Sequence, residues 1–156
     1  MHESVPSHVL CNAFAGGNAV AVRSVLIVDD DSGMAETLAD ILSVFGYAVT
    51  TASSAVTAVR MVTQTRPDLV LMDVTLPGID GIEATEKLRG ARATAAIPVA
   101  VLSAQAFGDN VERARQAGCV DYLTKPIGAR ELLERVGSLV GKNGNPRSPK
   151  RERKRR

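Results

Sequence analysis

Five polar side chains come directly after short apolar runs that read as buried strands: Asp29, Asp30, Asp73, Ser103 and Lys125. Carboxylate oxygens in this number suit a hard divalent cation such as Mg²⁺, which leaves a coordination position for a phosphate oxygen. A lysine and a hydroxyl opposite them can hold the other oxygens of a phosphoryl group. Since carboxylates form aspartyl phosphates, Asp73 is the candidate nucleophile. The predicted chemistry is phosphoryl transfer to Asp73.

These side chains can meet only if the apolar runs are neighbouring strands of one parallel sheet. Such runs, bounded by turn residues, are typical of parallel strands that are covered on both faces. Strand and helix patterns alternate five times, which predicts an α/β fold with an open five-stranded parallel sheet and helices on both faces. The predicted strands are residues 24–28, 47–51, 68–72, 97–102 and 120–123. The five polar side chains are expected at the edge where these strands end.

The intervening helices carry their own sequence signals. Ser32 is the expected cap of the first helix, and Ser53 is the expected cap of the second. The apolar stripe of the first helix extends to Phe45 by its spacing. The helix before the fifth strand has Val111 as its main apolar residue, so we expect it to be lightly anchored to the sheet.

Length and composition predict one cytoplasmic domain. The chain has 156 residues, few aromatic side chains and no Trp, which fits a single domain with an aliphatic core. Its two cysteines, Cys11 and Cys119, provide neither a disulfide framework nor metal-ligand spacing, so a reducing compartment is expected. No apolar run approaches the length of a membrane span, and the first residues do not resemble a signal peptide.

The charge is distributed unevenly along the chain. Residues 142–156 contain eight Lys or Arg and one Glu, for +7, whereas the rest has 11 basic and 16 acidic residues, for −5. We therefore predict a flexible extension over residues 1–23, a folded domain over 24–141 and a disordered basic tail over 142–156. The run Lys150–Arg156 could bind nucleic acid or an anionic surface by counterion release, or serve only as a solubilising end. The sequence leaves both interpretations open.

Five separated motifs resemble the receiver domain of two-component response regulators, and particularly its single-domain, chemotaxis-regulator-like form. They occur in the family's order and spacing over about residues 23–141: Val28-Asp29-Asp30, Met72-Asp73, Asp80-Gly81, Ser103-Ala104 and Tyr122-Leu123-Thr124-Lys125-Pro126. The resemblance implies a flavodoxin-like (βα)5 fold with strand order 2-1-3-4-5. It also implies a phosphoryl group on Asp73 that comes from a histidine kinase or a phosphotransfer protein.

The resemblance implies a Mg²⁺ site as well. Asp30 and Asp73 would bind the ion through their side chains, Asp29 largely through water, and Thr75 through its backbone carbonyl. Asp31 is better interpreted as a solvated or helix-terminal charge than as a further ligand, because the helix dipole favours an acid there.

The resemblance also implies that the remaining site residues form a conformational switch. Lys125 would bind the phosphoryl group, beside a cis bond to the following proline. Ser103 would move toward the phosphoryl oxygens and Tyr122 would follow it, while Thr75 and Gln105 would tune how fast water removes the group. The surface of the fourth helix, fourth strand and fifth strand would then change for an unknown downstream protein or for a second copy. The chain would act as a phosphoacceptor that assists its own phosphorylation and dephosphorylation, not as an ordinary enzyme.

Two enzyme classes with related features fit less well. A dinucleotide-binding enzyme needs a glycine-rich first turn, but residues 29–31 are acidic here and would repel a pyrophosphate. A phosphatase of the haloacid dehalogenase type would carry a second aspartate where this chain has Thr75.

Overall fold

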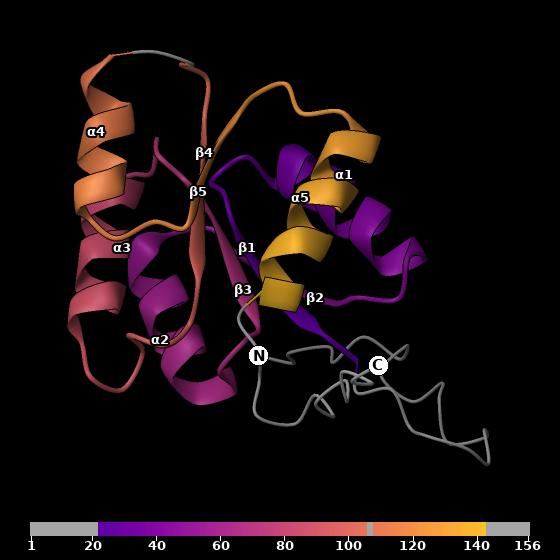
Figure 1. The fold of residues 1–156 in the computed structure, drawn as a ribbon, viewed down its shortest axis with the longest axis horizontal. Coiled ribbons are helices and arrows are strands. Elements are labelled where there is room, and N and C mark those ends of the chain that lie inside the picture. Colours follow the sequence, from indigo (N-terminus) through magenta and orange to yellow (C-terminus); the bar gives the residue numbers. More distant parts are fainter. Residues whose placement is uncertain (1–21, 106–107, 143–156) are drawn as a thin grey trace, which may run out of the picture.

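The computed structural model of the chain describes residues 22–105 and 108–142. In this part, five strands alternate with five helices (Figure 1). Their bounds are β1 (Ser24–Val28), α1 (Ser32–Val44), β2 (Ala48–Ala52), α2 (Ala55–Thr65), β3 (Leu69–Asp73), α3 (Gly81–Gly90), β4 (Val99–Ser103), α4 (Asp109–Gln116), β5 (Asp121–Thr124) and α5 (Ala129–Lys142). The strands are all parallel, in the order β2-β1-β3-β4-β5. The predicted fold class and strand order are confirmed.

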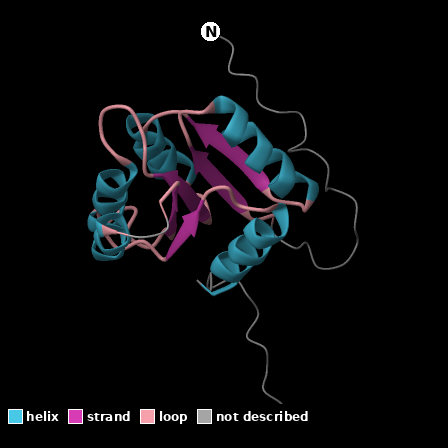
Figure 2. Ribbon diagram, turned by 90° about the horizontal axis from the view of Figure 1, so that it is seen from above, coloured by secondary structure: helices cyan, strands magenta, loops and turns pink. Residues whose placement is uncertain are grey.

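The sheet lies between two layers of helices (Figure 2). Alternate residues of a strand point to opposite faces, so neighbours along β1 belong to different cores. Val25 and Ile27 pack with α1 and α5, whereas Leu26 and Val28 pack with α2 and α3. Because both faces are covered, β3 and β4 are buried along their whole length. Continuous apolar runs are therefore the sequence pattern that this sheet requires.

Each observed strand begins and ends within two residues of its predicted position. The last helix ends at Lys142, one residue past the predicted domain boundary. Most of the predicted extension, residues 1–21, and most of the predicted basic tail, residues 143–156, lie outside the described residues. Among the described helices, none combines the length and the apolar character needed to cross a bilayer.

The predicted helix caps are wrong by one residue. Asp31 caps α1, since its side chain accepts a hydrogen bond from the Met34 N–H at 3.1 Å. Ser54 caps α2 in the same way. A cap must stand just outside the first turn to reach its free N–H groups, and Ser32 already lies inside the helix. The interpretation of Asp31 as a helix-terminal charge is confirmed.

Phe45 does not continue the buried stripe of α1, and this prediction is wrong. Phe45 is 64% exposed, whereas Leu42 is fully buried. The helix ends in a Schellman motif, in which Tyr47 N–H donates to Leu42 O at 3.2 Å and Gly46 N–H donates to Ser43 O at 3.1 Å. Gly46 adopts the positive φ of 91° that this turn needs. The reversal brings Tyr47 to the core and leaves Phe45 outside.

The helix α4 is anchored to the sheet by few residues, as predicted, but Val111 is not the main anchor. Ala114 is the buried residue of this helix, and Val111 is half-buried. Cys119 and Tyr122 pack partly buried against the same small core cluster. Small contact surfaces make α4 easier to move than its neighbours.

Candidate functional site

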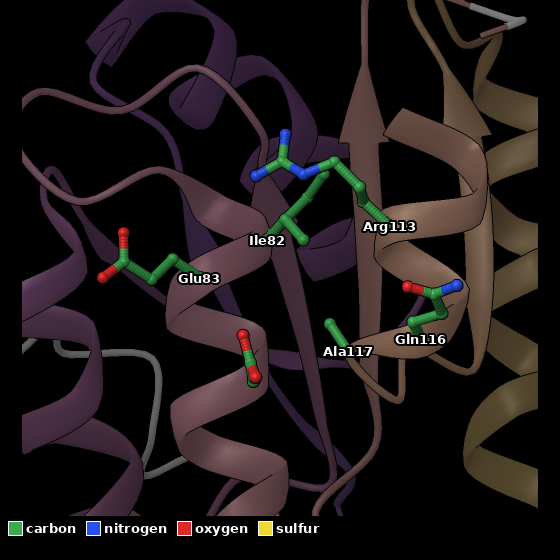
Figure 3. A pocket seen from close by; sticks show the side chains of 6 residues that line it. Ile82, Glu83, Arg113, Gln116 and Ala117 are labelled. Atoms are coloured by element: carbon green, nitrogen blue, oxygen red, sulfur yellow. The ribbon is translucent and has the colours of Figure 1, made fainter. Parts of the chain in front are cut away.

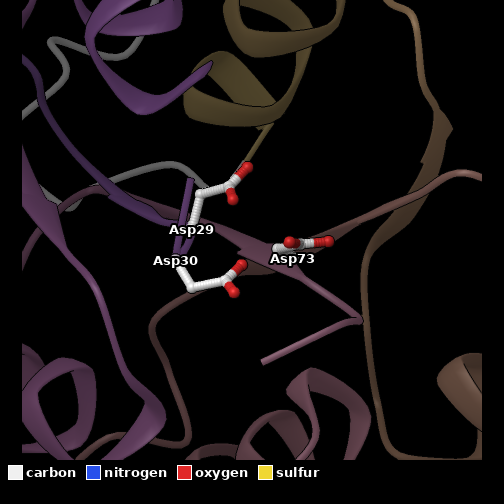
Figure 4. Close-up of side chains that lie close together, drawn as sticks. All are labelled: Asp29, Asp30 and Asp73. Atoms are coloured by element: carbon white, nitrogen blue, oxygen red, sulfur yellow. The ribbon is translucent and has the colours of Figure 1, made fainter. Parts of the chain in front are cut away.

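Three carboxylates from two adjacent strands meet at the edge of the sheet where the strands end (Figure 4). Because β1 pairs with β3 and Val28 is level with Met72, the next residues of both strands emerge side by side. One oxygen each of Asp29, Asp30 and Asp73 lies within 4.8 Å of the others. Asp29 and Asp73 are 2% and 5% exposed, while Asp30 is open to solvent.

A lysine from a third element completes this acidic cluster. Lys125 follows β5, and its Nζ lies 2.8 Å from Asp29 Oδ2 and 3.3 Å from Asp73 Oδ1. The bond from Lys125 to Pro126 is cis, as the family resemblance implies. The structure thus brings together four of the predicted site residues, from loops that are as much as 96 residues apart in sequence.

Burial and charge shift the protonation of two of these groups. Burial raises the pKa of Asp73, the Lys125 charge opposes this, and the Asp29 charge raises the pKa further, so that it lies above the usual value of 3.8. Burial lowers the pKa of the Lys125 ammonium, but the hydrogen bond to Asp29 and the charges of Asp73 and Asp29 outweigh it and raise the pKa. Lys125 therefore remains charged at neutral pH.

The cluster fits a divalent cation. Its three carboxylates face one ammonium group, so ionisation of all three leaves an excess of negative charge that Mg²⁺ would neutralise. Both Asp29 oxygens already accept hydrogen bonds, one from the Asp31 N–H at 2.9 Å and one from Lys125. These hydrogen bonds are compatible with the predicted role of Asp29 through water, and the assignment of Asp30 and Asp73 as direct ligands stays a prediction. The predicted carbonyl ligand, Thr75, stays a prediction.

Replacing Asp30 with asparagine is expected to weaken Mg²⁺ binding at least about tenfold, because the change removes a ligand charge and preserves the side-chain shape. Isothermal titration of Mg²⁺ measures the effect. Asp31→Asn is the matched control, since asparagine caps a helix as well as aspartate does and Asp31 is outside the cluster. An equal loss in both variants would mean that only the total negative charge matters.

The predicted switch residues lie beside the cluster, and two of them are hydrogen-bonded to its residues: the Lys125 N–H donates to Ser103 O at 2.7 Å, and the Thr75 N–H donates to Asp73. Ser103 ends β4 and is buried, and its Oγ accepts a hydrogen bond from the Gln105 N–H at 3.0 Å. Tyr122 donates its hydroxyl proton to Gln105 O at 2.9 Å. Thr75 is exposed, and its N–H donates to Asp73 Oδ1 at 3.3 Å. Ser103 and Tyr122 thus converge on Gln105.

Asp80 and Gly81 also shape the site, although the sequence predicted no role for either of them. Gly81 begins α3 so close to β3 that a Cβ atom there would lie 1.8 Å from the Asp73 carbonyl oxygen. Asp80 caps α3 through the Glu83 N–H at 2.8 Å and forms an ion pair with Arg113 of α4 at 3.1 Å. The Asp80-Gly81 motif was noted in the sequence, but Asp80 and Arg113 are 33 residues apart in the chain, so no sequence signal predicted their contact.

Asp80→Ala is expected to lower the free energy of unfolding by about 1–2 kcal/mol at pH 7, because it removes the cap and the ion pair. Burial raises the pKa of Asp80, but the hydrogen bonds from Glu83 N–H and Arg113 outweigh it, so the pKa is lowered from 3.8. Because the pKa of Asp80 is lower in the folded state than in the unfolded state, Asp80 stabilises the fold at pH values above its ordinary pKa. This stabilisation is lost as the pH falls through the folded-state pKa. Urea unfolding at pH 7 and at pH 3 should therefore give a smaller difference at pH 3.

Asp109→Ala provides the control for this measurement. Asp109 is exposed in the first turn of α4, and α4 has no side-chain cap. Its replacement is expected to cost no more than about 0.5 kcal/mol. Equal losses for the two variants would contradict a specific role for Asp80.

A cleft in the described part of the molecule lies elsewhere, between α3 and α4 (Figure 3). It has a volume of about 460 Å³, and its lining residues are Ile82, Glu83, Glu86, Arg113, Gln116 and Ala117. None of the acidic cluster's residues contributes to it. The cleft is therefore not part of the candidate site.

Comparison with known proteins shows which protein family this chain resembles. Residues 25–137 match the family model described as the response regulator receiver domain. The transcriptional regulatory protein PrrA of Mycobacterium leprae is 38% identical over 125 residues, which cover 80% of this chain and 53% of that protein. The chain thus spans about half the length of this relative and of the phosphate regulon regulator PhoB of Pseudomonas aeruginosa.

Other similar proteins are matched over nearly their whole length. The polar-differentiation response regulator DivK of Brucella ovis is 34% identical over 119 residues, which cover 76% of this chain and 97% of DivK. A putative response regulator from Chloroflexus aurantiacus has a TM-score of 0.74 and 36% identity, with 77% of this chain and 98% of that chain covered.

A receiver domain of a sensor histidine kinase from Pseudomonas aeruginosa PAO1 is also similar in structure. Its TM-score is 0.72 at 33% identity, and the match covers 78% of this chain and 99% of that chain. That structure has a magnesium ion coordinated in its active site cleft.

Proposed function

Because this chain belongs to the response regulator receiver domain family, we propose that it is a two-component switch whose phosphoacceptor is Asp73. The phosphoryl donor is a histidine kinase or a phosphotransfer protein, and the protein acts in the cytoplasm. The observation that carries the proposal is the cluster in which Asp29, Asp30 and Asp73 face Lys125 at the end of the sheet. Structural needs alone do not account for two buried carboxylates beside a third.

In the proposed reaction, a carboxylate oxygen of Asp73 attacks the phosphorus of a phosphohistidine. The new O–P bond forms as the P–N bond breaks, and the imidazole leaves with the electron pair. Asp29 holds the Lys125 ammonium at the site, where it can bind a phosphoryl oxygen as negative charge builds up. Mg²⁺, bound by Asp30 and Asp73, would neutralise the negative charge of the phosphoryl oxygens.

We propose that the signal then passes to the surface of α4, β4 and β5. Phosphorylation gives Lys125 and Ser103 new oxygens to contact, and Ser103 and Tyr122 both reach Gln105 in the loop before α4. The few buried residues of α4 support this assignment, since a lightly anchored helix is cheap to displace. A downstream protein, or a second phosphorylated copy, would read the altered surface.

The chain in this proposal is a substrate of phosphoryl transfer and not a turnover enzyme. Incubation with acetyl phosphate or phosphoramidate and Mg²⁺ is expected to add one phosphoryl group per chain. The label should be absent with a chelator and labile in both acid and base, as an acyl phosphate is. Undiminished labelling of the Asp73→Asn variant would refute the assignment.

A further inference from the structure

The helix α4 is attached to its neighbours by polar side chains as well as by its small core contact. Arg113, in the middle of α4, donates from Nη2 to Asp80 Oδ2 at 3.1 Å, and so reaches the residue that caps α3 (Figure 3). Among the ion pairs of the described residues, this is the one that joins α4 to another element. Because Ala114 is the buried residue of the helix, the pair adds to a weak apolar attachment.

The same arginine is bonded toward the loop before α4. Its Nη1 donates to Asn110 Oδ1 at 3.1 Å, and Asn110 Nδ2 donates to Gln105 Oε1 at 3.4 Å. These hydrogen bonds are exposed and follow one another without a break. We call the four residues the polar row: Asp80, Arg113, Asn110 and Gln105.

One end of the polar row lies against the backbone of Asp73. Asp80 is followed by Gly81, whose N–H donates to Val74 O at 2.9 Å. A Cβ atom at Gly81 would lie 1.8 Å from the Asp73 carbonyl oxygen, so α3 begins in direct contact with the end of β3. A displacement of Asp80 therefore acts on the backbone that carries Asp73.

The other end of the polar row is bonded to Ser103. The Gln105 N–H donates to Ser103 Oγ at 3.0 Å, and Gln105 O accepts the Tyr122 hydroxyl proton at 2.9 Å. In the proposed function, Ser103 turns toward the phosphoryl oxygens, and this turn breaks its hydrogen bond with Gln105. Since the Gln105 side chain is held by Asn110, the polar row favours the arrangement in which Ser103 stays with Gln105.

We propose, on the basis of the function proposed above, that Arg113 is a positioning residue of the switch. It holds α4 and Gln105 in the arrangement that opposes the turn of Ser103 toward Asp73. Because a coupling free energy is reciprocal, loss of the Arg113 side chain should strengthen the binding of a phosphoryl group or its mimic at Asp73. An exposed ion pair changes an equilibrium constant by at most about fivefold, and this limits the expected effect.

A purely structural role for Arg113 predicts a different result. Removal of its contacts with Asp80 and Asn110 makes the folded domain less stable, and a less stable domain binds a ligand no more tightly than the unmodified chain does. An affinity that rises when a stabilising contact is removed therefore indicates coupling between α4 and the acidic cluster.

Binding of beryllium trifluoride in the presence of Mg²⁺ tests the proposal on the whole chain. This anion forms a phosphoryl-like adduct with a carboxylate and needs no phosphate donor. We expect Arg113→Met to bind it about two- to fivefold more tightly than the unmodified chain does. Arg113→Lys keeps a positive charge near Asp80 and should return most of the affinity to the unmodified value. Amide hydrogen exchange in α4 should also be about two- to fivefold faster in Arg113→Met.

Arg115→Met is the matched control, because Arg115 lies on the same helix and pairs with Glu112 within it. This variant should change neither the affinity nor the exchange of α4. Asp80→Asn keeps a side chain that caps α3 and removes the charge that Arg113 meets. In that background, Arg113→Met should have little further effect on the affinity. Circular dichroism checks that each variant is folded.

The outcomes separate this proposal from the phosphoacceptor role. The proposal is overturned if Arg113→Met binds beryllium trifluoride no more tightly than the unmodified chain, even with faster exchange in α4, or if Arg115→Met gains as much affinity. If the unmodified chain does not bind the anion, or if Asp73→Asn binds it equally well, the assignment of Asp73 is wrong and the role of Arg113 is refuted with it.

Discussion

Lys125→Met is expected to slow the phosphorylation of Asp73 at least about a hundredfold, because it removes the charge that meets the incoming phosphoryl oxygens. Lys125 Nζ lies within 3.3 Å of both Asp29 and Asp73, so no rearrangement is needed to bring it to the reaction. Methionine retains most of the side-chain length and removes the ammonium group. The rate is measured as the appearance of acid-labile phosphate with phosphoramidate and Mg²⁺.

Lys87→Met is the control for this variant. Lys87 is an exposed lysine of α3 with a long 3.9 Å contact to Glu83, and it lies outside the acidic cluster. Its replacement should leave the rate within about twofold of the unmodified chain. If Lys125→Met were also phosphorylated at the unmodified rate, the Lys125 ammonium group would not stabilise the incoming phosphoryl oxygens.

Gly81→Ala is expected to lower the free energy of unfolding by about 3 kcal/mol or more. The added Cβ would lie 1.8 Å from the carbonyl oxygen of Asp73 and 2.7 Å from its carbonyl carbon. Both atoms belong to the backbone of β3, so no side-chain rotation relieves the contact. The higher helix propensity of alanine would offset this loss in the free energy of unfolding by only about 1 kcal/mol. Urea unfolding measures the loss, and displacement of Asp73 should also weaken Mg²⁺ binding.

Gly90→Ala, at the other end of the same helix, is the matched control. No atom lies within 4 Å of the Cβ position at Gly90, and its φ is not positive. This variant should be as stable as the unmodified chain or slightly more stable. Equal stability of Gly81→Ala would mean that α3 can move away from β3 without cost.

The parts of the fold that local patterns determine could be predicted from the sequence. Apolar runs that end in Asp29, Asp73 and Ser103 predicted the strands, because a strand covered on both faces must be apolar throughout. The parallel arrangement then placed the polar residues after each strand at one edge. The structure brings Asp29, Asp30, Asp73 and Lys125 together there, while their individual roles stay predictions.

The sequence could not predict features that depend on contacts between distant elements. The sequence indicated that Gly46 ends the first helix, which is correct, but spacing placed Phe45 on the buried stripe, whereas Tyr47 packs against the core that includes α5 and Phe45 is exposed. The contact of Arg113 with Asp80 and the approach of Gly81 to Asp73 depend on how helices pack on the sheet. Helical periodicity describes one face of a helix and does not determine its distance from another element.

Locating the phosphoryl group tests the central claim most directly. The full-length chain, incubated with acetyl phosphate and Mg²⁺, is treated with borohydride, which reduces an aspartyl phosphate to homoserine, and its peptides are sequenced by mass spectrometry. We predict homoserine at position 73 and at no other aspartate. Homoserine at position 29 or 30, or phosphate retained on Ser103, would contradict the assignment of Asp73 as the phosphoacceptor.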